Sequence, residues 1–90
     1  MRELASQGKA FAQFYLGNMY DAGEGVPEDN AEAVKWYRLA ADQGNAFAQY
    51  NLGNTYYRGQ GVPVNFVTAY AWLNIAAAFG DESAIGNRQS

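Results

Sequence analysis

The sequence predicts an all-α protein built from repeated helix pairs, an α-solenoid, and three observations carry this prediction. First, glycines recur 36 residues apart, at Gly8, Gly44 and Gly80. Second, residues 8–43 and 44–79 align without a gap and are identical at nearly half of their positions. Third, each copy holds two stretches in which apolar residues recur every three or four positions, the period of a helix with one buried face.

The first stretch of each copy predicts the first helix of a pair. Ala12, Leu16 and Tyr20 are four residues apart and therefore form one apolar stripe along a helix. We expect this first helix at about 10–22 and its repeat at about 46–58.

The second stretch predicts the partner helix. Ala33, Trp36 and Ala40 stand at positions i, i+3 and i+7, again on one helical face. The expected second helices lie at about 30–43 and 66–79.

The strings Gly-x-Gly-Val-Pro at 23–27 and 59–63 predict the loops within each pair. Glycine permits positive φ and proline prevents a helix from continuing. Because the two strings match, we expect the loops to be interchangeable structural parts. Asp29 with Glu32 fits a capping box at the start of one second helix, and Asn65 can cap the other.

The ends of the chain follow the same period. Residues 1–7 align with the tail of a preceding second helix, and 80–90 resemble the start of a third repeat. Gly44 and Gly80 are expected to end the second helices in the left-handed conformation, and a fifth helix is expected to begin after Asp81. The whole of 1–90 is thus predicted to be a single repeat domain.

Large and very small residues inside the predicted helices indicate packing. Trp36 and Trp72 are compatible with carbohydrate stacking, but they fall on the apolar stripe, which favours a core position. Gly17 and Gly53 each lower helix stability by about 1 kcal/mol relative to Ala. Close approach of a neighbouring helix would compensate for that cost.

Three motifs occur in both copies and carry a family resemblance. They are Ala-Gln-x-x-Leu-Gly at 12–17 and 48–53, Gly-x-Gly-Val at 23–26 and 59–62, and Ala-x-x-Trp-x-x-x-Ala-Ala at 33–41 and 69–77. With these motifs the chain resembles the Sel1-like repeat family, a relative of the tetratricopeptide repeat, and particularly its bacterial members. The resemblance implies a right-handed superhelix of antiparallel helix pairs that acts as a protein-interaction scaffold.

Composition argues against several classes of function. The chain has no Cys and no His, which removes the most common metal ligands and the most common general base. The acidic group Glu24, Glu28, Asp29 and Glu32 could be a calcium loop or a carboxylate pair, but Pro27 interrupts its spacing. We therefore expect no catalytic residue, no metal and no cofactor.

Charge and hydropathy also limit the partners. A net charge of −3 with six Lys and Arg residues argues against nucleic acid as a partner. No apolar run reaches the roughly 20 residues that span a bilayer. Met1 is followed at once by Arg2 and Glu3, which predicts no secretion signal in this chain. The sequence leaves the compartment unknown, with the cytoplasm or, if a signal was removed, the periplasm as the two expectations.

The exposed side of the first helices is the predicted binding site. In a solenoid of helix pairs this side lines the concave surface, and its positions match those that bind peptide in tetratricopeptide arrays. We call it the first-helix face; it comprises Phe14, Asn18, Asp21, Tyr50, Asn54, Tyr57 and Arg58. An Asn side chain can pair with both the N–H and the C=O of an extended peptide. The alternative is that Asn18 and Asn54 only bond to neighbouring helices.

The two repeats differ in charge. Residues 8–43 are strongly acidic, whereas Arg58 is the only charged residue within 44–79. The second helix at 66–79 also carries more large apolar side chains than one stripe can bury. Such a surface usually marks an interface, so we expect a homo-oligomer formed through the C-terminal repeat, in its simplest form a symmetric dimer that covers Phe66 and Phe79.

These observations favour a protein–protein interaction module, not an enzyme, with a protein or peptide as its partner. Two alternatives stay open. One is a hydrolase or ligand-binding relative connected with cell-wall material, and the other is a structural spacer in a longer repeat array.

Overall fold

The computed structural model describes residues 2–89 of the chain, with side chains described as far as residue 78. The helices are α1 (Arg2–Ser6), α2 (Ala10–Ala22), α3 (Asn30–Asp42), α4 (Ala46–Arg58) and α5 (Phe66–Gln89). No residue of this described part lies in a strand. The predicted all-α fold is therefore confirmed, and both first helices begin and end at the predicted residues.

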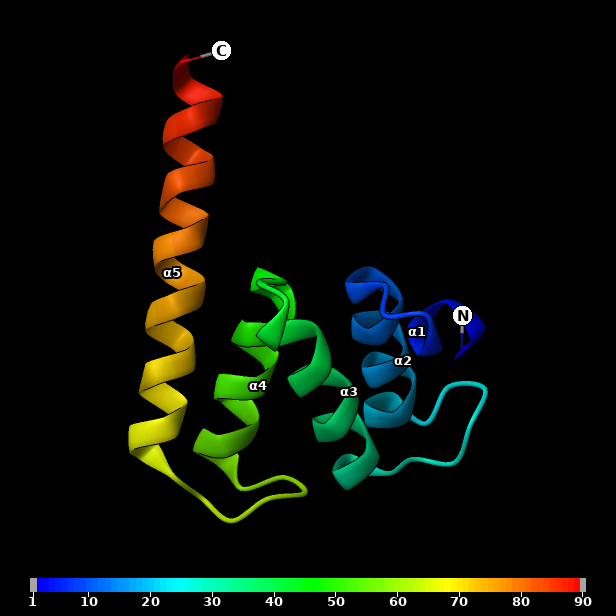
Figure 1. Ribbon diagram of the computed structural model, residues 1–90. Helices are drawn as coiled ribbons and strands as arrows, with labels where there is room; N and C mark the ends of the chain where they lie inside the picture. Colours follow the sequence, from blue (N-terminus) through cyan, green and yellow to red (C-terminus); the bar gives the residue numbers. More distant parts are fainter. Residues whose placement is uncertain (1, 90) are drawn as a thin grey trace.

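The helices form a single row (Figure 1). Each helix packs on the next one along the chain, from α1 on α2 to α4 on α5. The pairs α2/α3 and α4/α5 are the two repeats of the solenoid, and α1 covers the outer side of α2. Figure 1 also shows that α5 extends well beyond the ends of the other helices.

Side-chain caps define the starts of the second helices. The Asp29 side chain accepts a hydrogen bond from the Glu32 N–H at 3.1 Å, and the Asn65 side chain accepts one from the Thr68 N–H at 3.0 Å. Both predicted N-caps are confirmed. The return bond of a capping box is replaced, because the Asp29 N–H donates to the Tyr20 carbonyl at 2.9 Å. This bond ties the loop back to the end of α2.

The glycine loops have the same backbone but different surroundings. Gly25 and Gly61 have φ values of +76° and +77°, which only glycine adopts without strain. A Cβ at Gly25 would meet only the flexible end of Met19, at 3.3 Å. A Cβ at Gly61 would lie 2.6 Å from the Asn30 carbonyl carbon, at the start of α3. The two loops therefore share one backbone conformation, as predicted, but the second loop also packs against the start of the other repeat. That the loops are interchangeable stays a prediction.

Gly44 ends α3 as predicted. Its φ is +91°, its N–H donates to the Ala41 carbonyl at 3.0 Å, and the Asn45 N–H donates to the Ala40 carbonyl at 3.2 Å. These two bonds satisfy carbonyls that the helix itself leaves free.

Gly80 does not end α5, and the expected helix end and separate fifth helix are wrong. The helix continues from Phe66 through Gly80 to Gln89. A glycine weakens a helix by about 1 kcal/mol without forbidding it, and no proline comes after it to stop the helix. The assignment of 80–90 to a third repeat stays a prediction.

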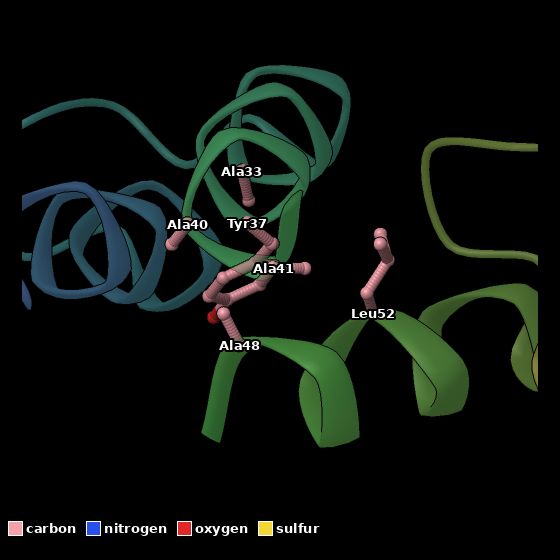
Figure 2. Packing of buried hydrophobic residues seen from close by; sticks show 6 residues of the cluster. All are labelled: Ala33, Tyr37, Ala40, Ala41, Ala48 and Leu52. Atoms are coloured by element: carbon pink, nitrogen blue, oxygen red, sulfur yellow. The ribbon is translucent and has the colours of Figure 1, made fainter. Parts of the chain in front are cut away.

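The core consists mainly of alanines, which lets the helices approach closely. Its central cluster comprises Ala33, Tyr37, Ala40, Ala41, Ala48 and Leu52, and Tyr37 of α3 is its largest side chain (Figure 2). A second cluster at the α1 end contains Ala5, Ala12, Leu16 and Trp36. The core position predicted for Trp36 is confirmed, whereas Trp72 is half-buried.

The helix glycines are sites of close approach, as predicted. A Cβ at Gly17 would lie 2.7 Å from the ring of Tyr37, and one at Gly53 would lie 2.8 Å from Cγ of Leu73. The glycine in each first helix therefore makes room for a large side chain of its partner helix.

Two buried glutamines were missed by the sequence analysis. Gln13 and Gln49 are both only 4% exposed. Gln13 Nε2 donates to the Ala5 carbonyl and Gln49 Nε2 to the Ala41 carbonyl, each at 3.2 Å. The same bond thus connects each first helix to the helix that precedes it in the chain, α2 to α1 and α4 to α3.

Candidate protein-binding surface

Aromatic rings connect α2 and α4 across the first-helix face. The ring of Phe14 lies 5.9 Å from that of Phe47 and 6.2 Å from that of Tyr37, measured between centroids. Phe47 is 71% exposed and Tyr15 is 51% exposed, so both offer apolar surface beside Phe14. Such pairs are a favourable arrangement of aromatic rings, and they fix the spacing of the two first helices.

A polar network lies beside these rings and uses Asn18. The Tyr37 hydroxyl donates to Asn18 Oδ1 at 2.6 Å, and Asn51 Nδ2 donates to the same oxygen at 3.3 Å. Asn18 therefore bonds to α3 and to α4, which is the alternative considered for it. Neither Tyr37 nor Asn51 was predicted as part of this region.

The environment of Tyr37 alters its acidity. Burial raises the pKa of the Tyr37 hydroxyl to about 12, and the negative charge of Asp21 adds to this rise, while the amide of Asn51 opposes it. The hydroxyl is therefore protonated at neutral pH and remains a hydrogen-bond donor to Asn18.

Asn54 stands at the position equivalent to Asn18 but has different neighbours. The residue equivalent to Tyr37 is Leu73, which has no hydroxyl. The Asn54 side chain is partly exposed and makes no hydrogen bond to another residue in the described part of the chain. Its amide can therefore bind a group from outside the protein.

Tyr57 belongs to an aromatic cluster at the start of α5. Its ring lies 5.3 Å from that of Phe66 and 6.5 Å from that of Tyr70. The three rings are 49%, 54% and 55% exposed. We call them the α4–α5 aromatic cluster. Its signal in the sequence is the replacement of Asp21, Asn30 and Val34 of the first repeat by aromatic residues.

The remaining predicted residues are solvent-exposed. Tyr50 is 57% exposed, and Asp21 and Arg58 are exposed at the ends of α2 and α4. The structure therefore divides the predicted face. Phe14 and Asn18 are held by contacts between repeats, whereas α4 presents Tyr50, Asn54 and Tyr57 toward solvent or the start of α5.

Other kinds of site find little support in the structure. Among the residues described, no three His, Cys, Asp or Glu side chains gather closely enough to hold a metal ion. Within the acidic group, the carboxylate of Asp29 caps α3. The described part of the chain contains no helix long and apolar enough to span a membrane.

Comparison with known families identifies the repeat. The family model described as the Sel1 repeat matches twice, at residues 10–45 and 46–81. The chain belongs to the Sel1 repeat family. Each match has the predicted period of 36 residues, and Sel1 repeats form helical modules that generally serve protein interactions.

Two solved bacterial structures with Sel1-type folds are similar to this chain. One is c5321, a protective antigen of uropathogenic Escherichia coli strains, with 46% identity and a TM-score of 0.87. The other is a Sel1 repeat protein from Oxalobacter formigenes, with 43% identity and a TM-score of 0.78. The matches cover 88% and 80% of this chain but only 17% and 30% of those proteins. No curated protein sequence is significantly similar to the chain.

Proposed function

We propose that this Sel1 repeat chain is a non-catalytic interaction module that binds an extended peptide segment of another protein along the first-helix face. The observation that carries the proposal is on α4, where the unbonded amide of Asn54 lies between two exposed tyrosines. Tyr50, Asn54 and Tyr57 stand at i, i+4 and i+7 and therefore share one side of the helix.

The chemistry of these three side chains suits a peptide. Tyrosine rings supply contact area and can donate a hydrogen bond, and such residues often dominate interface energies. The amide of Asn54 can donate to a peptide carbonyl and accept from a peptide N–H at the same time. Asn18 has less capacity for this, because its oxygen already accepts two bonds.

The alternatives predict different behaviour. A hydrolase needs a nucleophile with a base beside it, and the first-helix face offers no such pair among the described residues. A structural spacer would bind no peptide at all. We therefore regard peptide binding by α4 as the function that the geometry supports best.

The test uses a phage-displayed peptide library as the probe. Peptides selected on the wild-type chain are resynthesised, and their affinity is measured by isothermal titration calorimetry. The double variant Asn54→Ala/Tyr57→Ala should weaken binding by about 2 kcal/mol or more and keep the wild-type circular dichroism spectrum. Leu39→Ala, which removes an apolar side chain that is 41% exposed on α3, is the matched control and should bind normally.

Two results would contradict the proposal. The first is a selection that enriches no peptide, as expected for a spacer. The second is a double variant that binds as tightly as the wild-type chain, which would place the binding site elsewhere.

A further inference from the structure

The contact that joins the two repeats, α4 on α3, has an equivalent at the start of the chain, where α2 packs on α1. A first helix lies on the preceding second helix, and a buried glutamine donates to an alanine carbonyl of that helix. Gln13 bonds to Ala5 and Gln49 bonds to Ala41. Under these contacts Ala5 and Ala41 are each only 2% exposed. We call the covered surface of the second helix the receiving face.

The second repeat has the same receiving face, and there it is open. Ala77 is equivalent to Ala5 and Ala41, yet it is exposed. Tyr70 is 55% exposed, although its equivalent, Val34, is partly buried against the core. Tyr50 is likewise more exposed than its equivalent, Phe14. This open face continues the established repeat interface by one period.

We propose that a second copy of this chain docks its α2 on the open receiving face of the second repeat, joining the copies head to tail. Docking by the repeat geometry puts the amide of the incoming Gln13 at the Ala77 carbonyl. The incoming Tyr15, equivalent to Asn51, then stands beside Asn54, as Asn51 stands beside Asn18.

This arrangement requires α1 of the incoming copy to leave its place. Residues 2–6 of α1 are equivalent to 74–78 of α5, so both segments would occupy one position on α2. A helix of five residues has little stability of its own, whereas α5 is long and already packed on α4. We therefore expect α5 of one copy to replace α1 of the next.

Charge favours a second copy as the occupant. In the internal interface, the Gly61 loop lies against the backbone at the start of α3. The equivalent Gly25 loop of an incoming copy would lie at the start of α5, and it carries Glu24 and Glu28. Arg58 lies at the end of α4, and the start of α5 is the positive end of a helix dipole. The acidic repeat of one copy thus meets the repeat whose only charge is positive.

The proposal differs from the symmetric dimer expected from the sequence. Joining two different faces leaves one of each unoccupied, so growth does not stop at two copies. Of the two residues expected in the dimer interface, Phe66 lies at the start of α5, and the side chain of Phe79 lies outside the described residues.

Sedimentation equilibrium of the whole chain, from micromolar to millimolar concentration, tests the proposal with two Ala→Arg variants. In the wild type, the average mass should rise with concentration and pass that of a dimer. Ala77→Arg blocks the open face and should weaken association at least about tenfold. Ala5→Arg expels the competing α1 and should strengthen association at least about tenfold.

Ala5 and Ala77 are equivalent positions, so the same substitution is expected to have opposite effects on association at the two sites. Ala77 is exposed, so the arginine there should leave the circular dichroism spectrum and melting temperature unchanged. Peptide binding by α4 should also be kept in Ala77→Arg, which separates this proposal from the proposed function. A strictly monomeric wild type, a mass that levels at two copies, or association unaffected by Ala77→Arg would each overturn the head-to-tail arrangement.

Discussion

At the scale of single residues, Tyr37 connects the core to the first-helix face. Its ring is 2% exposed and fills the space left by Gly17, while its hydroxyl reaches Asn18 at 2.6 Å. The residue is thus both a packing element and a hydrogen-bond donor. Its ionisation would place a negative charge in the core near Asp21.

This leads to a prediction for alkaline pH. Because the pKa of Tyr37 rises from 10.0 to about 12 on folding, its contribution to stability is complete below pH 10 and is lost as the pH rises through about 12. A shift of about two pKa units corresponds to about 3 kcal/mol of unfolding free energy. Urea unfolding across this range should show the loss in the wild type.

The variant Tyr37→Phe should lack this alkaline loss while being less stable at neutral pH, since Asn18 loses a donor. Tyr50→Phe, which removes an exposed hydroxyl, is the control and should keep the wild-type pH dependence. An equal alkaline loss in Tyr37→Phe would mean that Tyr37 is not its source.

The same residue shows what the sequence could not reveal. Comparing the repeats predicts well where they agree, because shared glycines and apolar stripes impose one backbone on both copies. Tyr37 aligns with Leu73, and Asn51 aligns with Tyr15. A hydrogen bond made by residues that occur in only one copy leaves no periodic signal, so the sequence could not decide between the two roles considered for Asn18.

At the scale of helices, glycine has two different roles at equivalent positions. Gly44 ends α3 with φ of +91°, whereas α5 runs through Gly80. The local sequence could not distinguish these cases, because a glycine permits both conformations. The apolar stripes and N-caps predicted the helix starts correctly. The end of α5, in contrast, depends on whether the residues after Gly80 continue the helix.

Replacing each glycine with alanine should therefore have opposite effects. Gly80→Ala should raise the stability of α5 by up to about 1 kcal/mol, since alanine is the better helix former. Gly44→Ala should lower stability by about 1 kcal/mol or more, because alanine is strained at positive φ. Thermal unfolding followed by circular dichroism measures both.

The sign of the stability change in Gly80→Ala shows whether Gly80 lies within α5 or ends it. Destabilisation as large as that of Gly44→Ala would show that the glycine at 80 is needed in the left-handed conformation. That result would restore the helix end expected from the sequence.

At the scale of the whole molecule, stability depends on contacts between neighbouring repeats, as in other solenoids. One such contact is the approach of Gly61 to the backbone of Asn30, where a Cβ would lie 2.6 Å from the carbonyl carbon. Backbone on both sides leaves little room for adjustment. Gly25 has the same φ but no such neighbour, which makes it a matched control.

We expect Gly61→Ala to destabilise the protein by about 1–3 kcal/mol more than Gly25→Ala. The strain of positive φ is common to both variants, so the difference reports the contact between repeats. Urea unfolding of the two variants at neutral pH measures it. Equal loss of stability in both would show that the loop tolerates a Cβ beside α3.

The two indole rings lie in different repeats and in different surroundings. Trp36 is 8% exposed within the cluster at the α1 end, whereas the half-buried Trp72 has the Arg38 guanidinium 5.8 Å from its ring centre. A buried indole emits at shorter wavelengths than a solvated one, so the two emission bands should differ. Trp36→Phe and Trp72→Phe would each leave one native fluorophore, and the chain thereby carries a separate optical reporter in each repeat.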